Sequence, residues 1–376
     1  MKKILAILLC LSIALGALAG CAGQEAQTPS TEPSDYEETP SPTEPPEPSP
    51  TEPPVVLTMA SAAEVSGTNK GNALKKALEE LKSQSGGSLS IELYEGGEKG
   101  TDAEIIDAVK SGGITIYMGS ASMMKEVIPQ LAVLEIPMMF SSTEGCNAVL
   151  AGAVTDMMQP FFNEAGMQLI GAYSTSFHHF TSSAPIAAPA DLKGLRMTTS
   201  KSEYHQLFWK TLGCNVLPLE RSQVYIALKQ GMHGAQENTF REINTLKLFE
   251  VQSSLIKTRH TQDVGLYIMN KERYDALTEE QRTLISQFVS QAISNETEAV
   301  AEDEASQESN FVKKKMAVAE PDSELLAALK AAVQTVVDSV KKNIDPAFVD
   351  SYIAACKSGA ATPAPTPPET TDEPAE

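Results

Sequence analysis

Basic side chains are scarce in this sequence, and the motifs that usually accompany catalysis are missing. The chain has 29 lysines and arginines against 49 aspartates and glutamates, for a formal net charge of −20. Nucleic-acid phosphates are bound by clusters of Lys and Arg, and no such cluster occurs here, so a nucleic-acid partner is not expected. No phosphate-loop, dinucleotide-binding, nucleophile-elbow or HExxH pattern is present, so the sequence does not predict an enzyme.

Histidine and cysteine are also sparse. The five histidines show no metal-ligand spacing, and His178 and His179 would point to opposite faces of a strand, so neither a metal nor a cofactor is predicted. Cys146, Cys214 and Cys356 are the cysteines outside the N-terminal segment. One disulfide with one free thiol and three buried thiols are both compatible with this odd number.

Long apolar runs are limited to the N-terminus. Residues 1–20 carry two lysines and then about 16 uncharged residues, which is short for a membrane span and typical of an export signal. The sequence LAGC, Leu18 to Cys21, is similar to the lipobox of bacterial lipoproteins. We therefore expect cleavage before Cys21 and a lipid anchor on that residue, outside the cytoplasmic membrane; an ordinary signal peptide with a chance cysteine is the alternative.

Two flanking segments are too polar to form a core. Residues 21–54 contain three Thr-Glu-Pro repeats and no lysine or arginine, and residues 357–376 have a similar composition. Such segments cannot bury enough apolar area to offset the entropy of ordering. Both are therefore expected to be disordered, and the prolines and carboxylates of the first make it a semi-rigid spacer.

Strand and helix patterns alternate along residues 55–356, the expected folded region. The apolar stretch VVLTMAS is followed by a helical stripe that includes Leu74, Ala77 and Leu81, and then by the alternating strand SLSIELY. This order predicts an α/β fold with a parallel sheet and crossover helices. Ligands bind at the carboxyl ends of such strands. The candidate ligand loops are residues 60–69, 96–101, 119–122, 173–178, 198–200 and 236–239.

A long helix is predicted near the C-terminal end. Thr278 and Gln281 have the spacing of a capping box. The apolar positions of this helix thin out beyond Ile293. A helix of this kind either braces two lobes across a surface or simply ends in solvent.

Four motifs, in order, resemble the central signature of TRAP transporter substrate-binding proteins of the DctP type. They are PADLKGLRM (189–197), LGCNVLPL (212–219), VYIALKQG (224–231) and AQEN (235–238), where the family typically has DLKGLKIRV, LGANP, VYTALQQG and GQENP. The stretches LAVLEIPMMF and LYIMNKERYDALTEEQRTLI extend the likeness over most of residues 55–353.

The resemblance implies a two-lobed fold like that of type II periplasmic binding proteins, hinged by strands and a long bracing helix. It also implies a protein that binds a small ligand, usually an organic acid, between its lobes and does no chemistry on it. The ligand would pass to an ion-coupled permease with small and large membrane subunits. A surface receptor that presents the ligand to a sensor kinase is the alternative function.

One position departs from the family at the place where the ligand is usually held. In the family, an arginine on the strand after DLKG binds the ligand carboxylate, and an ungapped alignment places Thr198 there. A hydroxyl lacks both the charge and the two-pronged geometry of a guanidinium. Either the ligand is less anionic than usual, or another cation replaces the arginine. Arg196, two residues earlier on the strand, and Arg221, near a helix N-terminus, are the candidates.

Further departures point the same way. His178 stands where the family commonly has arginine, Gln223 replaces a usual glutamate, and Thr239 replaces the proline after Gln-Glu-Asn. The expected ligand is therefore neutral, zwitterionic or weakly anionic. The residues expected to line its cleft are Thr198, Arg221, Gln236, Asn238, His178 and Ser120, with Arg196 as the second candidate cation.

Overall fold

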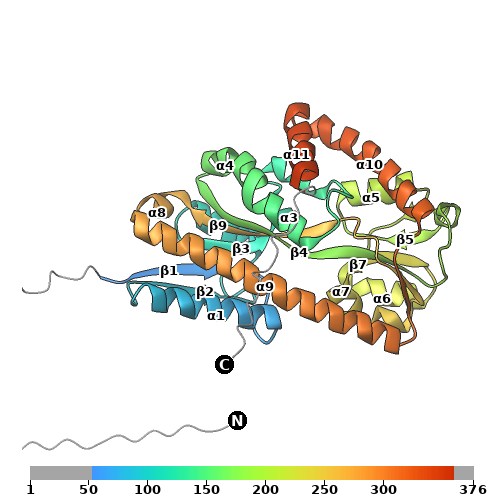
Figure 1. Ribbon diagram of the computed structural model, residues 1–376, viewed down its shortest axis with the longest axis horizontal. Helices are drawn as coiled ribbons and strands as arrows, with labels where there is room; N and C mark the ends of the chain where they lie inside the picture. The colour runs from blue at the N-terminus through green and yellow to red at the C-terminus, as the bar shows by residue number, and fades with distance from the viewer. Residues whose placement is uncertain (1–52, 360–376) are drawn as a thin grey trace, which may run out of the picture. The chain divides into compact units, whose positions relative to one another are not determined.

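One long strand is shared by two sheets in this computed structural model, which describes residues 53–359. Strand β4 (Met167–Ser182) pairs antiparallel with β9 (Gln262–Asn270) along its first part. Its last part pairs with β7 (Ala235–Thr239) and β8 (Ser254–Ile256). Each sheet is the centre of one lobe (Figure 1). The two-lobed α/β fold expected from the sequence is therefore confirmed.

The first lobe is built on the strand order β2-β1-β3-β9-β4. Its elements before β4 are β1 (Val55–Ala60), α1 (Asn69–Gln84), β2 (Leu89–Tyr94), α2 (Asp102–Lys110), β3 (Ile116–Ser120), α3 (Thr143–Val149) and α4 (Thr155–Glu164). Thr68 caps α1 by accepting a hydrogen bond from the Gly71 amide, and the predicted stripe of Leu74, Ala77 and Leu81 is buried in this lobe's core.

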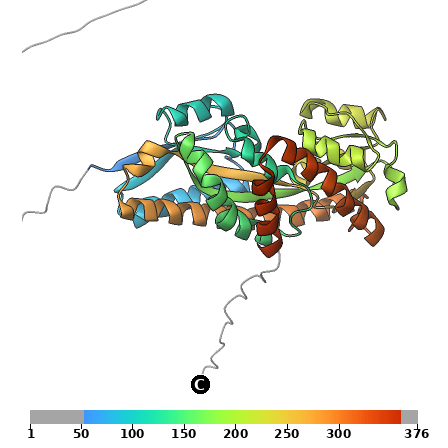
Figure 2. The ribbon, with the colours of Figure 1, turned by 90° about the horizontal axis from the view of Figure 1, so that it is seen from above.

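The second lobe continues the order as β4-β7-β5-β6, with β8 beside β4. Its elements between β4 and β9 are β5 (Arg196–Thr198), α5 (Glu203–Thr211), β6 (Asn215–Val216), α6 (Arg221–Lys229), β7, α7 (Phe240–Thr245) and β8. Figure 2 shows the blue-to-teal elements of the first lobe and the yellow-green elements of the second at opposite ends of the described region.

The sheet is parallel only within each lobe. Strand β1 pairs in parallel with β2 and β3, and β5 pairs in parallel with β6 and β7. The expected parallel pairing with crossover helices is confirmed for β1, β2 and β3, whereas β4 and β9 run antiparallel to each other and to their outer neighbours β7 and β3. These two antiparallel strands connect the lobes, and no local sequence pattern marked them for that role.

Helix α9 (Glu279–Lys313) braces the two lobes, as one of the two sequence interpretations proposed. Ile285, Phe288 and Val289 are buried in the core of the first lobe, and Phe311 is buried in the core of the second. The polar stretch between them is not a solvated end, since it lies over the junction of the lobes and runs past α7 (Figure 1).

A glycine lets α9 approach β4 closely. A Cβ atom on Gly171 would lie 2.4 Å from Cγ1 of Val289, a distance that real side chains do not tolerate. The position is therefore restricted to glycine as long as the brace stays in place.

The remaining elements complete both lobes. They are α8 (Lys271–Asp275), β10 (Ala317–Ala319), α10 (Ser323–Asn343), which packs on α5, and α11 (Pro346–Gly359), which packs on α3. Cys146, Cys214 and Cys356 are buried, unpaired thiols, and burial raises the pKa of Cys146 and Cys214 to about 12. Within residues 53–359, no helix is both long and apolar enough to cross a bilayer.

The N-terminal predictions lie outside the described residues. These are the export signal, the lipid on Cys21 and nearly all of the 21–54 spacer. Residues 55–356, the expected binding domain, are described throughout. Helix α11 continues to Gly359, three residues into the segment that was expected to be disordered.

Helix α9 carries a buried carboxylate, Glu296, at its contact with the first lobe. Glu296 is almost fully buried and accepts hydrogen bonds from the Tyr173 and Tyr267 hydroxyls, both at 2.6 Å, and pairs with Lys70 Nζ at 3.0 Å. Burial opposes the charge of Lys70, but Tyr173 and Glu296 outweigh it and raise the pKa of Lys70 above its ordinary value. The Glu296→Ala variant should therefore lose about 3 kcal/mol or more of unfolding free energy, because Lys70 keeps its charge without its carboxylate partner.

Urea unfolding of the wild type and the variant measures this loss. The matched control is Glu302→Ala, which removes an exposed carboxylate from the same helix. Equal losses in the two variants would show that the buried cluster does not hold the brace.

Candidate functional site

Two neighbouring cavities lie between the lobes. The first, of about 580 Å³, lies between residues 120–135 of the first lobe and residues 200–205 of the second. The second, of about 810 Å³, lies between residues 61–70 of the first lobe, residues 239–245 of the second, and residues 300–307 of α9. Both volumes are in the range of small-molecule sites.

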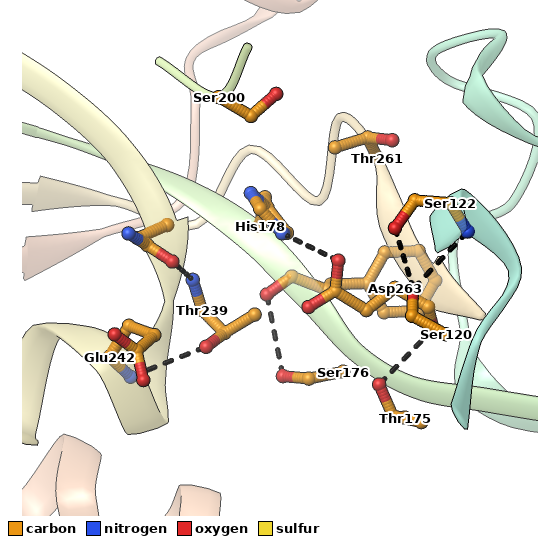
Figure 3. Close-up of polar contacts among 12 residues, drawn as sticks. Ser120, Ser122, Thr175, Ser176, His178, Ser200, Thr239, Glu242, Thr261 and Asp263 are labelled. Carbon is orange, nitrogen blue, oxygen red and sulfur yellow. Dashed lines mark hydrogen bonds and ion pairs between the residues drawn. The ribbon is translucent and has the colours of Figure 1, made fainter. Parts of the chain in front are cut away.

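The two cavities meet over the strands that connect the lobes. Ser120, Ser122, Met123, Asp263 and Val264 line both of them. Figure 3 shows Asp263 in the middle, with Ser120 and Ser122 of the first lobe on one side and Thr239 and Glu242 of the second on the other. The shared floor is therefore made by β9, and both lobes supply walls.

A buried carboxylate lies beneath this floor and gathers histidines from distant parts of the chain. Glu237 is 3% exposed and makes a short contact with His178 Nδ1. His260 Nε2 lies 3.2 Å from Glu237 Oε2, and His205 Nδ1 lies 3.8 Å from Oε1. The Thr199 hydroxyl also donates to Glu237. Glu237 of β7 therefore contacts β4 at His178, the residue where β4 leaves its pairing with β9 and begins to pair with β7.

Two carboxylates flank His178 and favour its charged form. Its Nε2 lies 3.1 Å from Asp263 Oδ1 (Figure 3), and its Nδ1 contacts Glu237. Burial opposes the charge, but Glu237 and Asp263 together raise the pKa of His178 well above its ordinary value. Burial likewise opposes the charge of Glu237, and His178 holds the pKa of that carboxyl well below its usual range. The imidazolium is therefore neutralised within the protein and offers no free charge to a ligand.

His260 differs from His178 although both touch Glu237. Burial lowers the pKa of His260, and the contribution of Glu237 does not reverse the shift. Its Nδ1 is 2.8 Å from the Thr258 hydroxyl. Beside the same carboxylate, burial therefore favours the neutral form of His260, whereas Glu237 and Asp263 favour the charged form of His178.

Hydroxyl groups dominate the uncharged polar lining of the cavities. They come from the connecting strands and from both lobes. The residues are Ser61, Thr68, Ser120, Ser122, Tyr173, Thr175, Ser176, Ser200, Ser202, Thr239 and Thr245. Because a hydroxyl both donates and accepts, this lining suits a ligand that carries hydroxyl groups itself.

One amide in the first cavity lacks a partner. Gln262 is 6% exposed and lines the cavity, yet its Nε2 makes no hydrogen bond to any residue that the structure describes. A buried donor left unpaired costs about 1–3 kcal/mol. Gln262 is therefore a buried residue of the cavity wall with an unused donor, and sequence reasoning had not singled it out.

The structure brings only part of the predicted site to the cavities. Ser120 lines both, and His178 lines the first. Thr198 and Gln236 are buried neighbours on β5 and β7 that line neither cavity, and Gln236 donates to the Thr181 hydroxyl instead. Asn238 also lies outside both linings, and its Oδ1 accepts from the Thr239 amide.

The two candidate cations have other contacts. Arg196 is exposed and donates to the Gly231 carbonyl at 2.8 Å. Arg221 is 60% exposed in its side chain and binds both carboxylate oxygens of Glu242. Neither residue lines either cavity.

Among the predicted ligand loops, residues 60–69, 119–122 and 173–178 contribute most to the cavities. Residues 198–200 and 236–239 contribute one residue each, Ser200 and Thr239, and residues 96–101 contribute none. Lys70, Arg241, Gln262 and Asp263 line the cavities but were not predicted. Lys70 and Arg241 closely follow the predicted loops 60–69 and 236–239, whereas Gln262 and Asp263 begin the connecting strand β9, for which no local sequence pattern gave a signal.

Two lobes around a hydroxyl-lined cleft form the arrangement expected of a solute-binding protein, and a comparison with known protein families agrees with it. The sequence profile of "Bacterial extracellular solute-binding protein, family 7" matches residues 60–343. The chain belongs to this family. The resemblance carried by the four sequence motifs is thereby confirmed.

Other solute-binding proteins are similar to this chain in sequence or in fold. The 2,3-diketo-L-gulonate-binding periplasmic protein of Escherichia coli is 28% identical over 233 residues, which cover 62% of this chain and 71% of that protein. The sialic acid-binding periplasmic protein of Vibrio cholerae is 23% identical over 317 residues, or 80% and 97% of the two chains. A TRAP periplasmic solute-binding protein from Ochrobactrum anthropi matches with a TM-score of 0.76 at 25% identity, over 81% of this chain and 96% of that one.

The His178–Glu237 pair gives the solute-binding protein a defined pH dependence. The folded-state pKa of His178 lies above the unfolded value of about 6.5, so its stabilisation is complete below that pH and is lost as pH rises through the folded pKa. Between pH 7 and pH 9, the wild type should lose up to about 1.4 kcal/mol of unfolding free energy per pH unit relative to the double variant His178→Gln/Glu237→Gln.

Urea unfolding at pH 7, 8 and 9 tests this slope. The double variant removes both partners together, so neither His178 nor Glu237 is left as a buried charge without its counterpart. Parallel stability profiles would mean that His178 is not charged in the folded protein.

Proposed function

We propose that this protein is an extracytoplasmic solute receptor, tethered by a lipid on Cys21, which captures a small polar or weakly anionic metabolite between its lobes. It delivers the metabolite to a TRAP permease with small and large membrane subunits and leaves it chemically unchanged. The observation that carries the proposal is the pair of cavities whose walls come from both lobes and whose floor is the connecting strand β9.

The arrangement suits capture by closure. The lobes are joined by β4, β9 and α9, so a rotation about these connections changes the width of the cleft while leaving each core intact. A ligand that touches both walls binds more tightly to the closed arrangement, and this difference in affinity drives closure. A permease can then distinguish the loaded receptor from the empty one by its shape.

The lining favours a hydroxylated ligand of low charge. Its abundant Ser and Thr hydroxyls match a polyol or sugar-derived ligand, and the relatives named for 2,3-diketo-L-gulonate and sialic acid bind sugar acids. His178 is already neutralised by Glu237 and Asp263, so a highly charged anion finds little compensation on the floor.

Ligand-dependent thermal unfolding tests the proposed function. The soluble chain beginning at Ala22 is mixed with an acid panel (sialic acid, D-glucuronate and D-gluconate) and with an amide panel made of the corresponding amides. Binding at about a hundred times the dissociation constant adds about 2.7 kcal/mol, which raises the Tm by a few degrees. At least one compound should give this rise; no rise with either panel would count against a receptor for sugar-derived ligands.

Gln262 supplies a sharper prediction because stability and binding should move in opposite directions. The Gln262→Leu variant removes a buried donor that has no partner, so the empty protein should be as stable as the wild type or about 1 kcal/mol more stable. The same variant should bind the best compound of the panels about tenfold or more weakly, because a ligand hydrogen bond is lost.

Unfolding of the empty protein and calorimetric titration measure the two effects. The Gln252→Leu variant is the control, because that buried amide bonds Thr181 and Val251 and lines neither cavity. A Gln262→Leu variant that binds as well as the wild type would exclude this amide from the site.

A further inference from the structure

The cationic side chains on the cavity walls are, with one exception, already paired with carboxylates. The pairs are Lys70 with Glu296 at 3.0 Å, Lys125 with Glu135 at 2.5 Å, and Lys201 with Glu220 at 2.5 Å. His178 is held in the same way by Glu237 and Asp263. Arg241 is the exception: it lines the second cavity and has neither an ion pair nor a side-chain hydrogen bond with any residue in the described range 53–359.

Local structure directs Arg241 into the cleft. Helix α7 follows β7 directly, and Thr239, which caps it, lies opposite His178 in the sheet. Phe240 and Ile243 are the buried residues of this helix. Arg241 and Thr245, one turn apart on another face, both line the second cavity.

We propose that Arg241 binds the anionic group of the ligand, the role that the family resemblance assigns to the position of Thr198. The inference rests on the proposed function, and it names the residue that sets which class of ligand the receptor binds. A guanidinium offers two parallel N–H donors to a carboxylate, and closure of the cleft strengthens the pair by excluding water. Thr198 cannot act in this way, because it is 2% exposed and lines neither cavity.

The same cavity limits the ligand to a single anionic group. Asp303 and Glu304 line the wall formed by α9 and have no cationic partner within ion-pair distance in the described part of the chain. Burial raises the pKa of Glu304, and its carboxylate accepts from the Ser176 hydroxyl. A second carboxylate on the ligand would meet the acceptor oxygens of these two side chains and the negative charge of Asp303. The ligand class is therefore a monoacid whose other end carries hydroxyl groups or an ammonium group.

Calorimetric titration of charge variants tests the role of Arg241. With the acid panel, Arg241→Gln should weaken binding about tenfold or more, because a charge-assisted hydrogen bond is lost, whereas Arg241→Lys should recover part of the affinity. Binding of the amide panel should change less than about threefold in either variant, and the diacid galactarate should bind the wild type at least about tenfold more weakly than D-gluconate.

Two control variants separate a local role from a general loss of charge. Lys229→Gln removes an exposed cation from α6 of the same lobe, and Arg221→Gln removes the cation first suggested by the sequence. Equal acid binding by the wild type and Arg241→Gln overturns the inference, as does a larger loss in Arg221→Gln. Binding of the amides alone also overturns it but leaves the proposed function intact. Binding of neither panel to the wild type removes the proposed function and the inference together.

Discussion

The ion pair between His178 and Glu237 is the contact on which the cleft depends. It lies where β4 passes from one sheet to the other, so it joins the second lobe to the floor that both cavities share. Its two charges satisfy each other in a buried setting, where an unpaired charge costs several kcal/mol. His178 stands where the family commonly has arginine, but its charge is taken up by Glu237 and is not available to a ligand.

Charge neutralisation extends from this pair around the cleft. Lys70, Lys125 and Lys201 each face a carboxylate, and the α9 wall adds Asp303 and Glu304. Such a lining repels multiply charged anions and leaves hydroxyl groups to recognise a polar ligand. Paired cations therefore occur at several positions around the cleft, and not only near Thr198, where the family resemblance predicts an arginine.

Sequence reasoning was reliable where the signal was local. The capping box at Thr278, the apolar stripe of α1 and the ordered motifs predicted the α/β lobes and the bracing helix, all of which the structure shows. Contacts that join distant segments were not predictable. Glu237 meets histidines from positions 178, 205 and 260, and the antiparallel course of β4 and β9 decides which loops face the cleft. Arg221 has the expected residue type and helix position, yet it pairs with Glu242, which no sequence pattern indicated.

The protonation state of His178 is the most direct test of this account. Nitrogen-15 NMR of the imidazole rings at pH 7.5 distinguishes an imidazolium, with both nitrogens protonated, from a neutral ring, and the His178→Gln variant assigns the signal. The account predicts an imidazolium in the empty protein that stays unchanged when a bound acid saturates the cleft. A neutral His178 that gains its proton only on binding the acid would contradict it, because the charge would then serve the ligand and not Glu237.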